Sequence, residues 1–388
     1  MDNVKNVPEI RFEGFDGEWE EIKFQNVGDF YSGGTPLSSN ANYYNGDISF
    51  IRSGEIDKNK TELFLTREGL INSAARLVKK GDVLLALYGA TSGEISISKI
   101  EGAINQAILA IIPDENFSNY FIKNYFVIKK EEINSKYLQG GQKNLSGKII
   151  KSIACIFPSS NEQTQIGNFF KNLDEKLELE KEKHEKLINF KKAMLDDMFP
   201  KEGAKVPKVR FEGFYDGWNY TILKNILSSE KKGKAQLSIL KPGKNLYLDA
   251  DALNGNSEFF CDAVPDVAKT DVLILWDGSK AGTVYSNFEG VLGSTLKSLT
   301  FNDSINSYYV YSFLDSKKDT IFNYYRTPNI PHVVRNFTSS FEIPIPSPEE
   351  QALIGSFFKN LDEKIELSEK RIGKIENFKK AMLDKMFV

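Results

Sequence analysis

Hydrophobic residues recur at three- and four-residue steps along two long stretches of the chain, residues 162–199 and 350–387. This spacing is typical of amphipathic helices with a narrow apolar face. No proline interrupts either stretch, and prolines lie shortly before both of them and directly after the first. We therefore predict two helices of about 37 residues, each roughly 55 Å long. Helices this long with so narrow an apolar face need a partner, and each is the obvious partner of the other.

The two stretches are copies of one sequence. They align at a constant offset of 188 positions without insertion, and 25 of the 38 residue pairs are identical. Residues 7–15 and 206–214 form a shorter repeat near the start of each half, whereas the regions between the repeats have diverged. The chain is therefore a tandem duplication with a preserved frame. We predict that its two helices pack antiparallel about a pseudo-two-fold axis.

Short apolar runs bounded by Gly, Asp or Pro predict β-strands in the diverged regions. They lie at residues 82–87 and 102–112 of the first half and at residues 271–275 and 290–296 of the second. Further helices are predicted at residues 120–134 and 307–319.

The predicted fold class is thus α/β (α+β), with two globular domains joined by two long antiparallel helices that form a coiled coil. The expected boundaries are 1–158 for the first domain, 159–200 for the central helix, 201–347 for the second domain and 348–388 for the C-terminal helix.

Composition and charge narrow the function. The 388 residues carry a formal net charge of −3. Residues 20–157 hold 16 basic and 15 acidic side chains, and residues 220–345 hold 13 of each. A protein that binds nucleic acid alone usually has a basic surface, so a DNA-reading role would need a partner that neutralises phosphates. Without a 20-residue apolar run or a signal-peptide pattern, and with one cysteine in each half, we expect a cytoplasmic protein with free thiols.

Motifs for catalysis are missing from the sequence. The chain has only two histidines, His184 and His332, and it has no phosphate-binding Walker loop, no dinucleotide-binding glycine pattern and no Asn-Pro-Pro-Tyr-type methyltransferase signature. We therefore expect neither a catalytic site nor a metal site in this chain.

Several segments, taken in order, resemble one known family, the specificity subunits of type I restriction–modification systems. In the first half they are Ser-Gly-Gly-Thr-Pro at 32–36, Ile-Ser-Phe-Ile-Arg-Ser-Gly-Glu-Ile at 48–56, Lys-Gly-Asp-Val-Leu-Leu-Ala-Leu-Tyr-Gly-Ala-Thr at 80–91, Ala-Ile-Asn-Gln-Ala at 103–107 and Gly-Gly-Gln-Lys-Asn-Leu-Ser at 140–146. The Glu-Gln pairs at 162–163 and 350–351, with the helices that follow them, complete the resemblance, which covers nearly the whole chain.

The resemblance implies two target-recognition domains that each read one half of a split, asymmetric DNA sequence. The helices would set the spacer and dock two DNA methyltransferase subunits, and two motor-nuclease restriction subunits would complete the complex. This chain would be non-catalytic and without a cofactor, while S-adenosylmethionine, ATP and Mg²⁺ would act on the partner subunits. Two other readings stay open: a coiled-coil scaffold whose domains bind proteins, and a fused enzyme with a divergent active site.

DNA sequence is read by polar side chains on base edges, so loop residues next to strands are the candidates. Those in the first half are Arg52, Thr91, Ser92, Gln106, Lys143 and Asn144. Those in the second half are Lys280, Lys297, Arg326, His332 and Arg335. For each residue alone, a local role as a turn or cap is equally plausible.

Two aromatic pairs are candidates for partner binding. Phe169 and Phe170 in the first helix, and Phe357 and Phe358 in the second, are adjacent and therefore too wide for one helical contact face. We predict that one member of each pair packs on the other helix and one faces a methyltransferase subunit.

Overall fold

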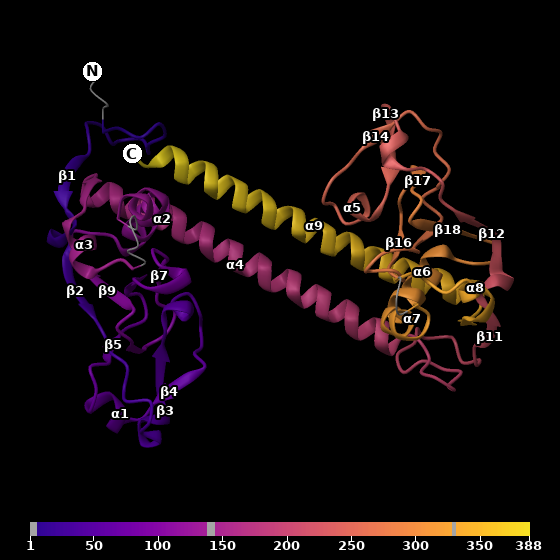
Figure 1. Cartoon of the computed structure of the whole chain (residues 1–388), viewed down its shortest axis with the longest axis horizontal. Coiled ribbons are helices and arrows are strands. Elements are labelled where there is room, and N and C mark those ends of the chain that lie inside the picture. The colour runs from indigo at the N-terminus through magenta and orange to yellow at the C-terminus, as the bar shows by residue number, and fades with distance from the viewer. Residues whose placement is uncertain (1–5, 138–143, 328–330) are drawn as a thin grey trace. The chain divides into compact units, whose positions relative to one another are not determined.

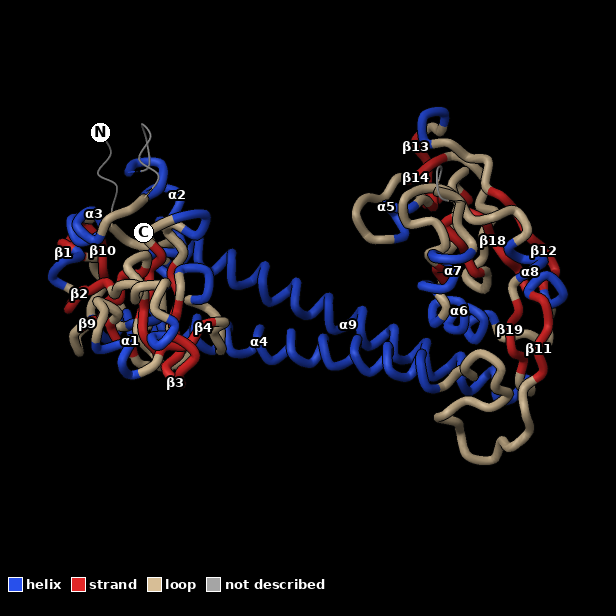
Figure 2. Tube along the Cα trace, turned by 60° about the horizontal axis from the view of Figure 1, so that its bottom comes forward, coloured by secondary structure: helices blue, strands red, loops and turns tan. Residues whose placement is uncertain are grey.

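The computed structural model describes residues 6–137, 144–327 and 331–388. The chain divides into two compact units. Unit 1 comprises Met1–Glu180 with Arg371–Val388, and unit 2 comprises Lys181–Lys370. The two long helices, α4 (Ser160–Asp197) and α9 (Pro348–Met386), each contribute to both units, and Figure 2 shows that the strands belong to one unit or the other. The predicted long helices at 162–199 and 350–387 are therefore present within two residues of the expected ends.

Unit 1 contains two four-stranded sheets and a two-stranded ribbon (Figure 1). The first sheet has the antiparallel order β2-β9-β6-β7, the second has the order β4-β3-β8-β5, and the ribbon pairs β1 with β10. The strands are β1 (Glu20–Lys23), β2 (Gly28–Ser32), β3 (Tyr44–Ile51), β4 (Leu63–Leu65), β5 (Arg76–Val78), β6 (Val83–Ala86), β7 (Ile95–Ile97), β8 (Gly102–Ile104), β9 (Ile108–Pro113) and β10 (Ala154–Phe157). The shorter helices are α1 (Arg67–Ile71), α2 (Asn119–Tyr137) and α3 (Gly147–Ser152).

Unit 2 repeats this plan. Its first sheet has the order β12-β18-β15-β16, its second has three strands in the order β14-β13-β17, and β11 pairs with β19. The strands are β11 (Asn219–Ile222), β12 (Leu227–Lys232), β13 (Pro242–Leu248), β14 (Phe260–Cys261), β15 (Val272–Leu275), β16 (Val284–Ser286), β17 (Val291–Leu292), β18 (Leu296–Phe301) and β19 (Glu342–Ile345). The shorter helices are α5 (Ala250–Leu253), α6 (Ser307–Ser316), α7 (Lys318–Tyr324) and α8 (Phe337–Ser340).

One inner strand of each first sheet, β6 in unit 1 and β15 in unit 2, is buried on both faces. In β6, Val83 and Leu85 pack in the core beneath α2, whereas Leu84 packs in the core beneath the second sheet. In β15, Val272 and Leu273 divide in the same way. Because successive side chains of a strand point to opposite faces, a continuous apolar run is what such a strand requires. This explains why both runs were recognisable in the sequence.

The apolar run at residues 102–112 forms two strands rather than one. It divides between β8 and β9, which belong to different sheets. The side chain of Asn105 accepts a hydrogen bond from the Ala107 amide at 3.1 Å, which stabilises the turn between them. An asparagine favours such a turn because its side chain bonds to nearby backbone. The run at 290–296 divides in the same way between β17 and β18.

The long helices pack antiparallel within each unit. In unit 1, the ring of Phe169 on α4 lies 6.2 Å from that of Phe378 on α9. In unit 2, Phe190 on α4 lies 6.2 Å from Phe357 on α9. Phe357 is the copy of Phe169 and Phe378 is the copy of Phe190, so the same contact occurs in both units with the helices exchanged. The contacts that the pseudo-two-fold relation predicts are therefore present.

A buried ion pair fixes the start of each long helix. Glu162 of α4 is fully buried and accepts hydrogen bonds from Arg11 Nε at 2.7 Å and Nη2 at 2.8 Å. Glu350 of α9 accepts the same two bonds from Arg210 at 2.7 and 2.9 Å. An acidic side chain in the first turn also complements the helix dipole. The short repeat at residues 7–15 and 206–214 therefore supplies the arginine that anchors each helix.

Candidate functional site

In unit 1, loops from distant parts of the sequence meet where β6 ends. Leu87 follows β6, and its amide donates to the Ala107 carbonyl at 2.7 Å. Its carbonyl accepts a hydrogen bond from the Leu145 amide at 2.9 Å. The Gly33 amide donates to the Asn105 carbonyl at 3.2 Å. Residues 33–36, 88–92, 105–107 and 144–146 therefore form one surface, which we call the loop edge of unit 1.

Unit 2 builds its loop edge with two equivalent backbone bonds, and a third bond joins the equivalent loops in the opposite direction. The Trp276 amide donates to the Thr295 carbonyl at 2.7 Å, and the Val333 amide donates to the Trp276 carbonyl at 2.9 Å. The Ser294 amide donates to the Ala235 carbonyl at 2.8 Å. The corresponding residues are 233–235, 277–281, 293–295 and 331–333. The divergence between the two halves has therefore changed side chains on a conserved backbone frame.

A glycine allows the first loop of each edge to approach the neighbouring backbone. A Cβ atom at Gly33 would lie 1.8 Å from the Ile104 carbonyl oxygen. At Gly233 it would lie 2.0 Å from the Gly293 carbonyl oxygen. Backbone atoms cannot yield by that much, so both positions require glycine.

Unit 1 brings four of its predicted contact residues to its loop edge. Gln106 is exposed and accepts a hydrogen bond from the Thr35 hydroxyl at 2.7 Å. Asn144 is exposed and Thr91 is half-buried. Ser92 is buried and donates to the Leu87 carbonyl at 3.0 Å, which is a local structural role. The predicted contact Lys143 lies outside the described residues.

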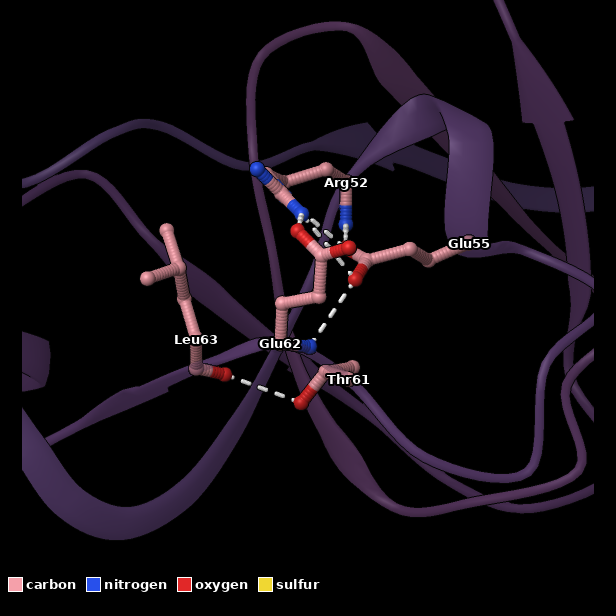
Figure 3. A network of polar contacts seen from close by, with 5 residues as sticks. All are labelled: Arg52, Glu55, Thr61, Glu62 and Leu63. Atoms are coloured by element: carbon pink, nitrogen blue, oxygen red, sulfur yellow. Dashed lines mark hydrogen bonds and ion pairs between the residues drawn. The ribbon is translucent and has the colours of Figure 1, made fainter. Parts of the chain in front are cut away.

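Arg52 lies at the same edge because of strand direction. It follows β3, which runs parallel to β8, and Asn105 follows β8. The Arg52 Nε donates to Glu55 at 2.9 Å and its Nη2 donates to Glu62 at 2.5 Å (Figure 3). Burial alone would raise the pKa of Glu55, but the hydrogen bond from Arg52 and two backbone amides lower it below its ordinary value. The pair is therefore ionised at neutral pH.

Unit 2 holds two basic side chains next to its loop edge. Lys297 lies 3.5 Å from the centroid of the Trp276 ring and 2.5 Å from Glu230. Arg326 lies 3.8 Å from the centroid of Phe322 and donates to the Ser279 carbonyl at 2.8 Å. Aromatic faces and carboxylates thus hold these cations in place.

Three further predicted residues of unit 2 differ in their placement. Lys280 is exposed within the loop edge. The backbone of His332 pairs with Asp277, and its Nδ1 lies 3.0 Å from the Thr327 hydroxyl. Arg335 is exposed on the turn before α8. Among the residues that the structure describes, no hydrogen bond or ion pair joins Arg335 to the loop edge.

Sequence reasoning missed several residues of the loop edges. Thr35, Tyr88 and Asp277 belong to the loop edges, and Lys232 directly precedes the loop edge of unit 2. Lys232 forms an ion pair with Asp277, which occupies the position of Tyr88 in the other half. Each of these four residues stands next to a glycine in the sequence, and that position was the signal that could have identified them.

The predicted partner-binding aromatics divide by burial. Phe170 and Phe358 are fully buried and pack against Phe387 and Phe199 of their own units, with ring centroids 5.9 Å apart in both cases. Phe169 and Phe357 are half-buried. Only the latter two keep ring surface that a partner can reach.

Comparisons with known proteins add independent findings. Residues 16–189 and 188–377 match the model of the type I restriction modification DNA specificity domain. A 122-residue segment, 31% of this chain, is 32% identical to the type I restriction enzyme MjaVIII specificity subunit of Methanocaldococcus jannaschii. A 246-residue segment, 60% of this chain, is 24% identical to the MjaIX specificity subunit of the same organism. These matches span 29% and 55% of the two relatives' lengths.

A solved structure is similar over nearly its whole length. The crystal structure of the type I restriction–modification S subunit from M. genitalium aligns with a TM-score of 0.74 at 17% identity, covering 98% of this chain and 99% of that one. At this identity, the similarity shows a shared fold. Among the described residues, no helix is long and apolar enough to cross a membrane.

Proposed function

Because this chain belongs to the type I restriction modification DNA specificity family, we propose that it is the DNA-recognition subunit of a type I restriction–modification complex. Each unit reads one half of a bipartite, asymmetric DNA site through its loop edge. The chain itself carries no catalytic function, and S-adenosylmethionine, ATP and Mg²⁺ act on its partner subunits.

One observation carries this proposal beyond family membership: the same loop edge is built twice with different side chains. Polar residues such as Gln106 and Asn144 suit the donor and acceptor pattern of adenine. Arg326 and the exposed Lys280 offer the donors that guanine accepts. An asymmetric bipartite site requires two recognition surfaces with different side chains, and the two loop edges provide them.

Because both recognition regions are nearly neutral, we infer that partner subunits supply part of the free energy of DNA binding. Phosphate contacts supply most of the sequence-independent affinity for DNA. Ion pairs within this chain already occupy Arg52, Lys232 and Lys297. We therefore expect the isolated chain to bind DNA weakly, and the methyltransferase subunits to neutralise the remaining phosphates.

The duplicated helices support docking of two methyltransferase subunits. Phe190 and its copy Phe378 are both 48% exposed, and Leu179 and its copy Leu367 are 51% and 50% exposed. Repeated exposure of large apolar side chains at matched positions is typical of an interaction surface. Each unit holds one such phenylalanine and one such leucine, so each can receive one partner subunit.

Co-purification with the cognate methyltransferase tests the proposal. The wild-type complex should contain two methyltransferase subunits per chain and should methylate a bipartite motif, read by sequencing that detects methylated bases. Phe190→Ala and Phe378→Ala should each remove one of the two partner subunits. The control is Leu353→Ala, because Leu353 is 46% exposed but its copy in the other half is Gln165.

Two results would contradict the proposal. One is a stable complex with a single methyltransferase subunit, and the other is a methylated motif without two separated halves. Methylation or cleavage by the isolated chain would instead support a fused enzyme.

A further inference from the structure

Two carboxylates divide the hydrogen-bonding positions of Arg52 between them. Glu55 bonds to one edge of the guanidinium, taking Nε at 2.9 Å and Nη2 at 3.1 Å. Glu62 bonds to Nη2 at 2.5 Å from another side. Figure 3 shows both carboxylates turned toward the guanidinium. Nη1 forms no hydrogen bond with the residues that the structure describes. The end of the guanidinium formed by Nη1 and Nη2 is therefore only partly occupied.

The two carboxylates differ in how firmly they are held. The Glu55 side chain is 11% exposed and also accepts hydrogen bonds from the Arg52 amide at 3.2 Å and the Glu62 amide at 3.0 Å. The Glu62 side chain is 80% exposed, and Arg52 is the hydrogen-bond partner that the structure records for its carboxylate. Glu55 is therefore fixed to the backbone, whereas Glu62 is free to rotate into solvent.

We propose that Arg52 is a guanine-reading residue whose orientation is set by Glu55 and whose reading face is covered by Glu62 until DNA displaces it. This inference rests on the proposed function. An arginine reads guanine by donating two N–H groups from the end of its fork to O6 and N7. The Glu55 contact leaves that end free, and the Glu62 contact covers one of its two nitrogens. Glu55 is thus a positioning residue, and Glu62 is a carboxylate that the guanine base replaces when DNA binds.

The two carboxylates on Arg52 make its contribution to specific DNA binding larger than its contribution to non-specific DNA binding. A guanidinium neutralised by a fixed carboxylate gains little from a phosphate, because one ion pair merely replaces another. It still presents directed donors to a base edge. Arg52 should therefore contribute little to binding of arbitrary DNA and much to recognition of one base pair in the half-site read by unit 1.

The test uses the full chain in complex with its methyltransferase. Glu62→Gln should tighten binding to a duplex that carries the target motif by about 1.5- to 5-fold, the usual strength of one exposed ion pair, because DNA no longer has to displace the carboxylate from Arg52. It should leave the methylated motif unchanged. Glu115→Gln is the matched control, because Glu115 is exposed and follows β9 at the end of the sheet away from the loop edge. It removes the same charge and should not change affinity.

Glu55→Gln should instead relax the motif at one base pair of one half-site and leave the other half unchanged. Loss of one bidentate base contact reduces discrimination by about 5- to 150-fold at that position. Arg52→Lys keeps the charge and both carboxylates but lacks the planar fork, so it should relax the same position even if Glu55→Gln disturbs the loop.

Three outcomes would overturn the inference. They are an unchanged motif in Arg52→Lys, an altered motif in Glu62→Gln, and equal affinity changes in Glu62→Gln and Glu115→Gln. A wild-type complex that methylates a bipartite motif keeps the proposed function intact in all three cases. A wild-type complex without such a motif would refute the proposed function itself.

Discussion

The two helix anchors differ in the hydrogen bonding of an equivalent tryptophan, which provides an internal comparison. Trp218 and Trp19 are equivalent and almost fully buried, at 1% and 2% exposed. The Trp218 indole Nε1 donates to the Glu350 carboxylate at 3.1 Å. The Trp19 Nε1 has no hydrogen-bond partner in the described part of the chain. Replacing each tryptophan with phenylalanine therefore removes similar packing but only one hydrogen bond.

The expected difference follows from the charge of the acceptor. A hydrogen bond to a charged group contributes about 1.5–3 kcal/mol to stability. Trp218→Phe should therefore destabilise unit 2 by about 1.5–3 kcal/mol more than Trp19→Phe destabilises unit 1. Removing a buried N–H that lacks a partner should partly offset the packing loss in Trp19→Phe. In a Glu350→Gln background, most of the extra cost of Trp218→Phe should disappear.

Hydrogen exchange measured by mass spectrometry can follow the two units separately. Peptides that contain β6 report on unit 1 and peptides that contain β15 report on unit 2, because core strands exchange only through large-scale opening. Equal losses of protection in both variants, or a larger loss in Trp19→Phe, would refute the role given to the Trp218–Glu350 bond.

Three further outcomes are expected. Burial would raise the pKa of Asp174, but ion pairs with Lys123 and Lys379 lower it below its ordinary value of 3.8. The ionised Asp174 therefore stabilises the folded state above about pH 4, and this contribution is lost as pH falls through the folded-state pKa. The free energy of urea unfolding should accordingly depend less on acidic pH in Asp174→Asn than in the wild type. Gly373→Ala should stabilise α9 by about 0.5–1 kcal/mol, because the added Cβ meets open space. Gly355→Ala should lower the thermal unfolding temperature, because its Cβ would lie 2.3 Å from the side chain that caps α6. Inserting about four residues in the middle of α4, with a matched insertion in α9, adds roughly 6 Å of helix and should lengthen the methylated spacer by about one or two base pairs, with both half-sites unchanged.

Patterns that depend on local periodicity were readable from the sequence. The long helices could be predicted because apolar residues recur at helical spacing over about ten turns without a proline, and the duplication repeats the pattern. The inner strands β6 and β15 were readable because both of their faces are buried. The predicted fold class, with two globular units that share two long antiparallel helices, is confirmed.

Features that depend on tertiary contacts were not readable. The run at residues 102–112 is continuous in hydrophobicity, and only the Asn105 turn divides it between two sheets. Glu62 reaches Arg52 across ten positions of irregular chain. The burial of Phe170 depends on Phe387, more than two hundred positions away. The individual base contacts and the docking of partner subunits stay predictions.

Mapping of the methylated motif tests the central claim most directly. Asn144→Ala in the assembled complex should relax or weaken recognition in one half of the bipartite motif only, and Arg326→Ala should do so in the other half only. A lost bidentate base contact reduces discrimination by about 1–3 kcal/mol at the affected base pair. If either substitution changes both halves equally, or if both alter the same half, then the two loop edges are not independent readers of the two half-sites.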